Sequence, residues 1–191
     1  MNLLVGIPAY RKQIDINLGL MLVDLERRLP GFKLWSESIC SLDRARNNII
    51  ERAMMERSDW LLMVDSDVFQ IPTTPVVAML EWAREHQPAL VGPPAIMRGG
   101  GINATEDGES FVTDSWLRQH REPAEVRRVG FGMVALNMGW LRSHWPVGPW
   151  CQSVQMADGK WFDEGFKMCE DVGAKGGAVF VDPRFMPTHR V

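Results

Sequence analysis

Two aspartates separated by one residue are the side chains in this sequence best suited to bind a cation. Asp65-Ser66-Asp67 follows directly on the apolar run Trp60-Leu61-Leu62-Met63-Val64, which is typical of a buried strand. In an extended chain, residues i and i+2 point to the same side, so both carboxylates would face one cation or one charged substrate. The simpler alternative is a strand that ends in a polar turn, since Asp and Ser are common turn residues.

Arginines near the start of a predicted helix could bind an anion. Arg44 and Arg46 fall in the first turns of the helix expected over residues 42–57, where free N–H groups and guanidinium donors can converge on phosphate oxygens. The alternative is a pair of surface arginines partnered by Asp43 or Glu51.

Three further groups could take part in chemistry near the end of the chain. His189 is a competent third ligand if two carboxylates already hold a manganese-like ion, although a lone histidine is more often merely solvated. Asp163 and Glu164 precede the last predicted helix, so either they cap its N-terminus or one of them serves as a general base.

The elements that must position these residues alternate between strand and helix. Strands are predicted at residues 2–7, 32–36, 60–64, 89–92, 129–136 and 178–181, and helices at 14–29, 42–57 with Ser41 as cap, from Pro75 onward with Thr74 as cap, 138–144 and 164–175. This alternation predicts an α/β fold with a mainly parallel central sheet flanked by helices. The carboxyl ends of such strands are where α/β proteins bind ligands. Residues 93–128 are polar and flexible in composition, either a mobile loop over a site or a surface excursion.

Composition limits the classes of protein to consider. The chain has 191 residues, of which 46% are hydrophobic, so one domain over residues 1–191 is expected. Its net charge is -3, so no global basic field would draw it to nucleic acid. No apolar run is long enough to span a bilayer, and the first residues lack the features of a signal peptide. We therefore expect a cytoplasmic protein. Cys40, Cys151 and Cys169 have no zinc-type spacing and are predicted to be reduced thiols.

Five segments, in order along nearly the whole chain, resemble the GT-A glycosyltransferases, specifically the short family-2-like enzymes of bacteria and bacteriophages. The segments are Gly6-Ile7-Pro8-Ala9-Tyr10, Ser41-Leu42-Asp43-Arg44-Ala45-Arg46-Asn47-Asn48, Trp60-Leu61-Leu62-Met63-Val64-Asp65-Ser66-Asp67, Gly130-Phe131-Gly132-Met133, and Val181-Asp182-Pro183-Arg184 with the closing Thr188-His189. The resemblance implies a GT-A fold and transfer of a sugar from a nucleotide-sugar donor, a UDP- or GDP-sugar, with Mn²⁺ or Mg²⁺ as cofactor.

The resemblance also implies roles for individual residues. Pro8, Ala9 and Tyr10 match the loop that holds the base and ribose, and Asp43, Arg46 and Asn47 match residues near the nucleotide. Asp65 and Asp67 match the motif that binds ribose and metal, and His189 matches a metal-ligand histidine. If the protein is phage-encoded, it would act in the host cytoplasm.

The expected acidic pair at the start of the last helix departs from the family pattern. Similar enzymes have Glu-Asp there, whereas this chain has Asp163-Glu164 in altered order and a literal Glu170-Asp171 pair later. The later pair leaves little more than one helical turn before Gly176, so the resemblance favours Glu164 or Asp163 as the catalytic base.

Other functions remain open at this stage. A haloacid-dehalogenase-type phosphatase also places Asp-x-Asp after a strand, but that motif continues differently where this chain has Phe69. A sugar-nucleotide pyrophosphorylase would need a Gly-rich phosphate loop that Pro8-Ala9-Tyr10 does not supply. A degenerate member could bind nucleotide or glycan without turnover. The acceptor of a transferase could be a glycan, a protein or a modified nucleic-acid base, and the oligomeric state is not indicated.

Overall fold

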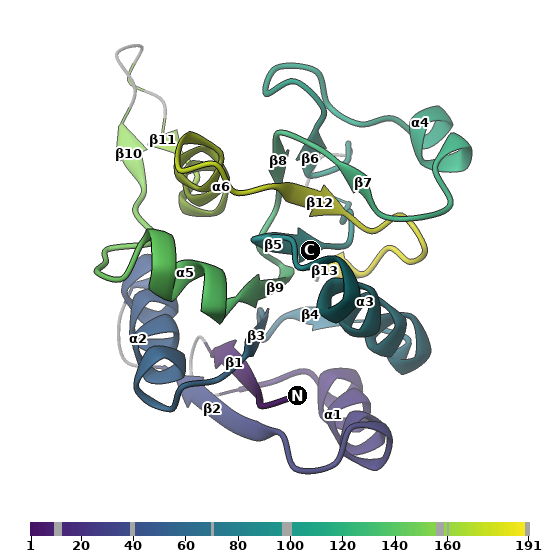
Figure 1. Ribbon diagram of the computed structural model, residues 1–191. Coiled ribbons are helices and arrows are strands. Elements are labelled where there is room, and N and C mark those ends of the chain that lie inside the picture. Colours follow the sequence, from purple (N-terminus) through teal and green to yellow (C-terminus); the bar gives the residue numbers. More distant parts are fainter. Residues whose placement is uncertain are drawn as a thin grey trace.

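The protein is built on a seven-stranded sheet, seen in a computed structural model that describes residues 1–9, 13–38, 41–69, 71–96, 101–155, 159 and 161–189 (Figure 1). In spatial order the strands are β2 (Lys33–Glu37), β1 (Leu3–Pro8), β3 (Trp60–Val64), β9 (Met133–Asn137), β5 (Leu90–Gly92), β12 (Val179–Val181) and β7 (Ala124–Glu125). β1 is parallel to β2 and β3, and β5 is parallel to β12, whereas β9 is antiparallel to both neighbours and β7 to β12. The predicted mainly parallel α/β sheet is confirmed.

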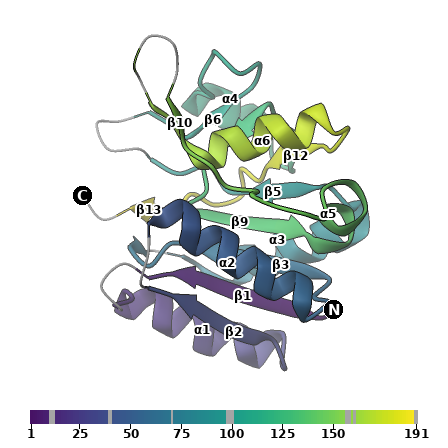
Figure 2. The same cartoon turned by 90° about the vertical axis from the view of Figure 1, so that its left-hand side faces the viewer.

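Helices cover both faces of this sheet (Figure 2). They are α1 (Ile16–Arg28), α2 (Leu42–Met55), α3 (Thr73–His86), α4 (Asp114–Gln119), α5 (Met138–His144) and α6 (Glu164–Ala174). α2, α5 and α6 share one buried apolar cluster, and α1 and α3 share a second. Leu61 and Met63 of β3 belong to the first cluster and Leu62 and Val64 to the second, because successive strand side chains point to opposite faces. None of the described helices is long and apolar enough to cross a membrane.

Three short strand pairs lie outside the large sheet. They are β4 (Val68–Phe69) with β13 (Thr188–His189), β6 (Ala104–Thr105) with β8 (Arg128–Val129), and β10 (Val154–Gln155) with β11 (Trp161–Phe162), all antiparallel. The first of these pairs matters for function, since it returns the end of the chain to the segment that follows β3.

Several predicted boundaries were wrong by one or two residues, and two of the differences have a clear physical cause. α3 begins at Thr73 with Pro72 before it, and Thr74 does not cap it. The hydroxyl of Thr73 is instead hydrogen-bonded to Asp24 of α1 and lowers the pKa of that carboxyl. The single strand expected over residues 129–136 is divided into β8 and β9, because the chain turns at Phe131-Gly132 before it enters the sheet.

Much of the segment expected to be either a mobile loop or a surface excursion is packed. Residues 101–128 contain β6, α4 and β7, and Ile102, Ala104, Val112 and Val126 belong to the core shared by α2, α5 and α6. Apolar residues here are sparse and without period, so their common burial was not evident from the sequence.

Three helices end in the same local arrangement, which the sequence repeats as Trp-x-Arg-x-His. The pairs are Trp82–His86, Trp116–His120 and Trp140–His144, with stacked rings whose centroids lie 4.5, 3.7 and 4.8 Å apart. In each pair the histidine Nδ1 donates to the carbonyl of the tryptophan four residues before it. The recurrence is a local arrangement in the last turns of these helices rather than a repeated domain.

Candidate active site at the carboxyl edge of the sheet

The candidate site lies where β1 and β3 end and where α2 and α6 begin (Figure 2). Pro8 closes β1, and the buried Ala9 that follows donates its N–H to the Glu37 carbonyl over 2.8 Å. Asp65 follows β3, and its N–H donates to the Gly132 carbonyl over 2.9 Å, which fixes the aspartate against the turn before β9. Three segments that are distant in sequence therefore meet at one edge of the sheet.

Arg46 is the centre of this edge. Its side chain is 3% exposed, and its Nη2 donates to both carboxylate oxygens of Asp65 at 2.9 Å. Nη1 donates to Glu164 of α6, and Nη2 also lies 3.3 Å from the carbonyl oxygen of Phe131. One buried guanidinium thus joins the residue after β3 to the first turn of α6.

Burial and charge act against each other in this cluster. Burial works to lower the pKa of Arg46, but the carboxylates of Asp65 and Glu164 outweigh it and raise that pKa, so the guanidinium stays charged. Desolvation raises the pKa of Glu164 above its ordinary value, while the charge of Arg46 opposes the rise. A carboxyl whose pKa is raised beside a charged partner is the kind of group that enzymes use as a base.

The two acidic pairs of α6 have different positions. Asp163 is the N-cap of α6, where its Oδ1 accepts from the N–H groups of Gly165 and Phe166 at 2.9 and 3.2 Å. Glu164, 6% exposed, points to Arg46 and accepts from the Ser153 hydroxyl at 3.3 Å. Of the two residues named as base, Asp163 is therefore engaged in capping and Glu164 contacts the cluster.

The later pair points elsewhere. Glu170 binds Arg127 and Arg128, and Asp171 binds Lys167 one turn back along the helix. These contacts account for both acids as surface ion pairs.

Asp67 and His189 are brought close through the backbone. β13 pairs with β4 so that the Cα of His189 lies opposite that of Val68, the residue after Asp67. Residues opposite each other in an antiparallel pair have Cα atoms about 4.5–5.5 Å apart. The imidazole of His189 and all of Tyr10 lie outside the described residues, so their predicted roles stay predictions.

The donor set fits a hard divalent cation. Asp65 and Asp67 supply carboxylate oxygens two residues apart at the sheet edge, and both residues are partly exposed. Asp65 also accepts hydrogen bonds from Arg46 at both oxygens. An ionised carboxylate can accept more than one bond at each oxygen. Among the side chains that the structure describes, no three His, Cys, Asp or Glu groups gather as a metal cluster.

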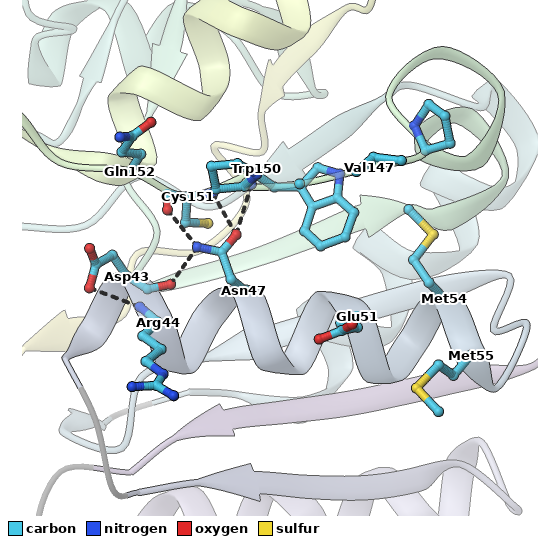
Figure 3. A pocket seen from close by; sticks show the side chains of 13 residues that line it. Asp43, Arg44, Asn47, Glu51, Met54, Met55, Val147, Trp150, Cys151 and Gln152 are labelled. Carbon is cyan, nitrogen blue, oxygen red and sulfur yellow. Dashed lines mark hydrogen bonds between the residues drawn. The ribbon is translucent and has the colours of Figure 1, made fainter.

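Asn47, expected near the nucleotide, holds a neighbouring segment in place (Figure 3). Its Oδ1 accepts from the N–H groups of Trp150 and Cys151 at 2.7 and 3.0 Å, and its Nδ2 donates to the carbonyls of Cys151 and Asp43 at 2.6 and 2.8 Å. We call residues 146–152 the clamped segment. Because Ser153 follows it directly and contacts Glu164, Asn47 helps to set the position of Glu164 from a distance.

Asp43 lies one turn before Asn47, at the start of α2. Its Oδ1 accepts from the Ser41 hydroxyl and from the N–H of Arg44 at 2.8 Å. The Ser41 contact is the main cause that lowers the pKa of Asp43, so this carboxylate is charged. Ser41 occupies the cap position as expected, but it binds Asp43 rather than a backbone N–H.

Several participants were not apparent from the sequence. Ser153, the carbonyl of Phe131 and the clamped segment have no motif, since their roles depend on contacts between residues far apart in the chain. Cys151 and Cys169 are free buried thiols whose pKa burial raises to about 12, which agrees with the expected reduced state, and Cys40 lies outside the described residues.

Comparisons with known proteins bear on the fold. No protein-family model and no curated protein matches the sequence. Among solved structures, A197 from STIV superposes with a TM-score of 0.64 at 15% identity, over 100% of this chain and 86% of that one. A nucleotide-diphospho-sugar transferase from Desulfovibrio desulfuricans G20 gives a TM-score of 0.53 at 10% identity, over 100% and 83% of the two chains. The fold is the GT-A fold of the nucleotide-diphospho-sugar transferases.

A longer structure agrees with this assignment. TarS of S. aureus, residues 1–349, superposes with a TM-score of 0.53 at 13% identity over 99% of this chain, and the chain spans 60% of it. The GT-A fold expected from the five sequence segments is thus confirmed. Because identities this low establish only the fold, activity has to be argued from the site.

Proposed function

We propose that the protein is a metal-dependent glycosyltransferase, which moves a sugar from a UDP- or GDP-sugar to an acceptor. The observation that carries the proposal is the buried Arg46, which joins Asp65 after β3 to Glu164 at the start of α6. This contact brings the nucleotide-side motif and the candidate base together at the sheet edge where α/β proteins bind ligands.

The roles follow from the chemistry of the side chains. Asp65, Asp67 and His189 would hold Mn²⁺ or Mg²⁺, and a bound cation neutralises charge on a departing diphosphate. Oε2 of Glu164 accepts the proton of the acceptor hydroxyl group, and the hydroxyl oxygen bonds to the anomeric carbon of the sugar. The nucleoside diphosphate then leaves with the electrons of the broken bond. Pro8, Ala9 and Tyr10 line the nucleotide side, and Arg46 holds Asp65 there. Asp43 and Asn47, which the resemblance also implies near the nucleotide, line the neighbouring groove instead.

Thermal unfolding with nucleotides tests the binding half of this proposal. We expect UDP or GDP to raise the melting temperature only with Mn²⁺, since a ligand at 100 times its Kd adds about 2.7 kcal/mol to stability. EDTA and Asp67→Asn should each abolish the shift. Absence of any shift with every nucleotide and metal, together with hydrolysis of p-nitrophenyl phosphate, would replace the proposal with the phosphatase alternative.

Turnover tests the catalytic half. Glu164→Gln should keep the shift with nucleotide and Mn²⁺ but lose cleavage of the nucleotide sugar by about 100-fold or more, as expected for a lost general base. Glu85→Gln on the exposed surface of α3 is the matched control and should keep both properties. A wild-type protein that binds nucleotide with metal but cleaves no nucleotide sugar would be the degenerate binder.

A further inference from the structure

An open groove of about 770 Å³ runs between α2 and the clamped segment (Figure 3). One wall is a single face of α2 that extends from Asp43 through Asn47 and Glu51 to Met54 and Met55. The twelve residue steps from Asp43 to Met55 correspond to about 18 Å of helix at 1.5 Å per residue. An extended peptide of about five residues has that length.

One end of the groove adjoins the segment that contacts the candidate base. Gln152 lines it, and the next residue, Ser153, contacts the carboxylate of Glu164. On the opposite wall, Asp43 and Asn47 line the groove while Arg46, between them in sequence, reaches into the ion cluster. A molecule that lies along the groove and extends past Gln152 would approach Glu164, as an acceptor must.

The far end of the groove is apolar and exposed. Val147 is 75% exposed and Met55 is 72% exposed, and both lie near Met54 and Trp150. Methionine side chains are adaptable, and they are common on surfaces that bind varied peptides. Trp150 is only 7% exposed, and its indole N–H donates to the Trp145 carbonyl, so it offers no open ring on which a sugar could stack.

The charge of the groove favours a basic occupant. Its lining carries two carboxylates, Asp43 and Glu51, against one guanidinium, Arg44. Within the described part of the chain, no cationic group pairs with the exposed Glu51. A lysine or arginine of a ligand could take that place, whereas phosphate or acidic sugar would be repelled.

We propose that this groove is the acceptor site and that the acceptor is a polypeptide segment, with a large apolar side chain at Met54–Val147 and a basic side chain at Glu51. The inference rests on the proposed function and chooses among the acceptor classes that the sequence leaves open. Main-chain groups and small side chains would continue the segment toward Glu164.

A library of pentapeptides, acetylated and amidated at the ends, tests the inference by binding alone. The wild type should select a large apolar residue and, at a separate position, Lys or Arg. Glu51→Lys should change the ratio of basic to acidic residues among the selected peptides by about tenfold in favour of acidic ones, because a lysine at position 51 repels a basic side chain that Glu51 attracts. The preference for a large apolar residue should stay the same. Val147→Asp should remove the apolar preference. Misfolding would abolish the preferences for basic and for apolar residues together, so it cannot explain a reversed charge preference.

Matched variants on other surfaces supply the control. Glu85→Lys on α3 and Val23→Asp on α1 change the same residue types at exposed positions and should leave the profile unchanged. A flat wild-type profile, or a profile unaffected by both groove variants, would overturn the inference. Loss of oligosaccharide binding, or of self-association, in Val147→Asp would assign the groove to a glycan or to a second copy instead. The rise in melting temperature of the wild type with nucleotide and Mn²⁺ tests the proposed function independently, so failure of the peptide inference can be distinguished from failure of the proposed function.

Discussion

Replacement of Arg46 by Met should destabilise the protein strongly, because it removes the cation from between two carboxylates and keeps the apolar stem. The Arg46 side chain is 3% exposed, and those of Asp65 and Glu164 are 14% and 8% exposed. Removal of one member of a buried ion pair costs about 3–5 kcal/mol. This is a large part of the 5–15 kcal/mol by which folded proteins are typically stable.

The loss should depend on pH in a defined direction. The pKa of Glu164 is raised in the folded protein, so between its ordinary value and the raised one the folded state binds more protons than the unfolded state. Stability from this group therefore falls as pH rises through that interval. Arg46 lowers the pKa of Glu164, and without it the interval extends to higher pH. The deficit of Arg46→Met should then be larger at pH 7.5 than at pH 5.

Urea unfolding at the two pH values measures this effect. With a slope of about 2–3 kcal/mol per M, the midpoint at pH 7.5 should fall by about 1–2 M. Arg28→Met is the control, because Arg28 and Asp24 form a pair with side chains 45% and 40% exposed, and its loss should cost about 0.5 kcal/mol or less. A loss below about 1 kcal/mol at pH 7.5, or an equal loss at both pH values, would refute the account of the cluster.

Other substitutions test the supports of the site. Asn47→Ala should cost about 1–3 kcal/mol in urea unfolding, because it leaves backbone groups of the clamped segment without their partners; unchanged stability would contradict the clamp. Gly92→Ala should cost about 1–3 kcal/mol, since a Cβ there would lie 2.7 Å from a main-chain oxygen of β9, whereas Gly19→Ala in α1, where the nearest atom is 4.0 Å away, should stabilise by about 0.5–1 kcal/mol; the reverse order in melting temperature would be inconsistent with this packing. Ser153→Ala removes a hydrogen bond to the charged form of Glu164, so the acidic limb of the pH–rate profile for donor cleavage should move to higher pH, and an unmoved limb would count against Glu164 as base.

The sequence determined the elements and the edge at which they meet. The apolar run before Asp65 became β3 with the predicted bounds, and α2, α5 and α6 begin where they were predicted. Such features are local: an apolar run, a helical period or a terminating Gly acts through neighbours in the chain. The mainly parallel direction of the sheet follows, because alternating strands and helices permit few other arrangements, whereas the antiparallel β9 at its centre was not indicated.

The tertiary structure decided which polar groups act together. Asp163 and Glu164 are adjacent in sequence, yet one caps α6 and the other meets Arg46, 118 residues away along the chain. Likewise, the packing of residues 101–128, the return of His189 to Val68 and the clamp on residues 146–152 come from contacts between distant segments. No period or spacing encodes these contacts, because they depend on which buried donors and acceptors remain to be paired once the sheet and helices have packed.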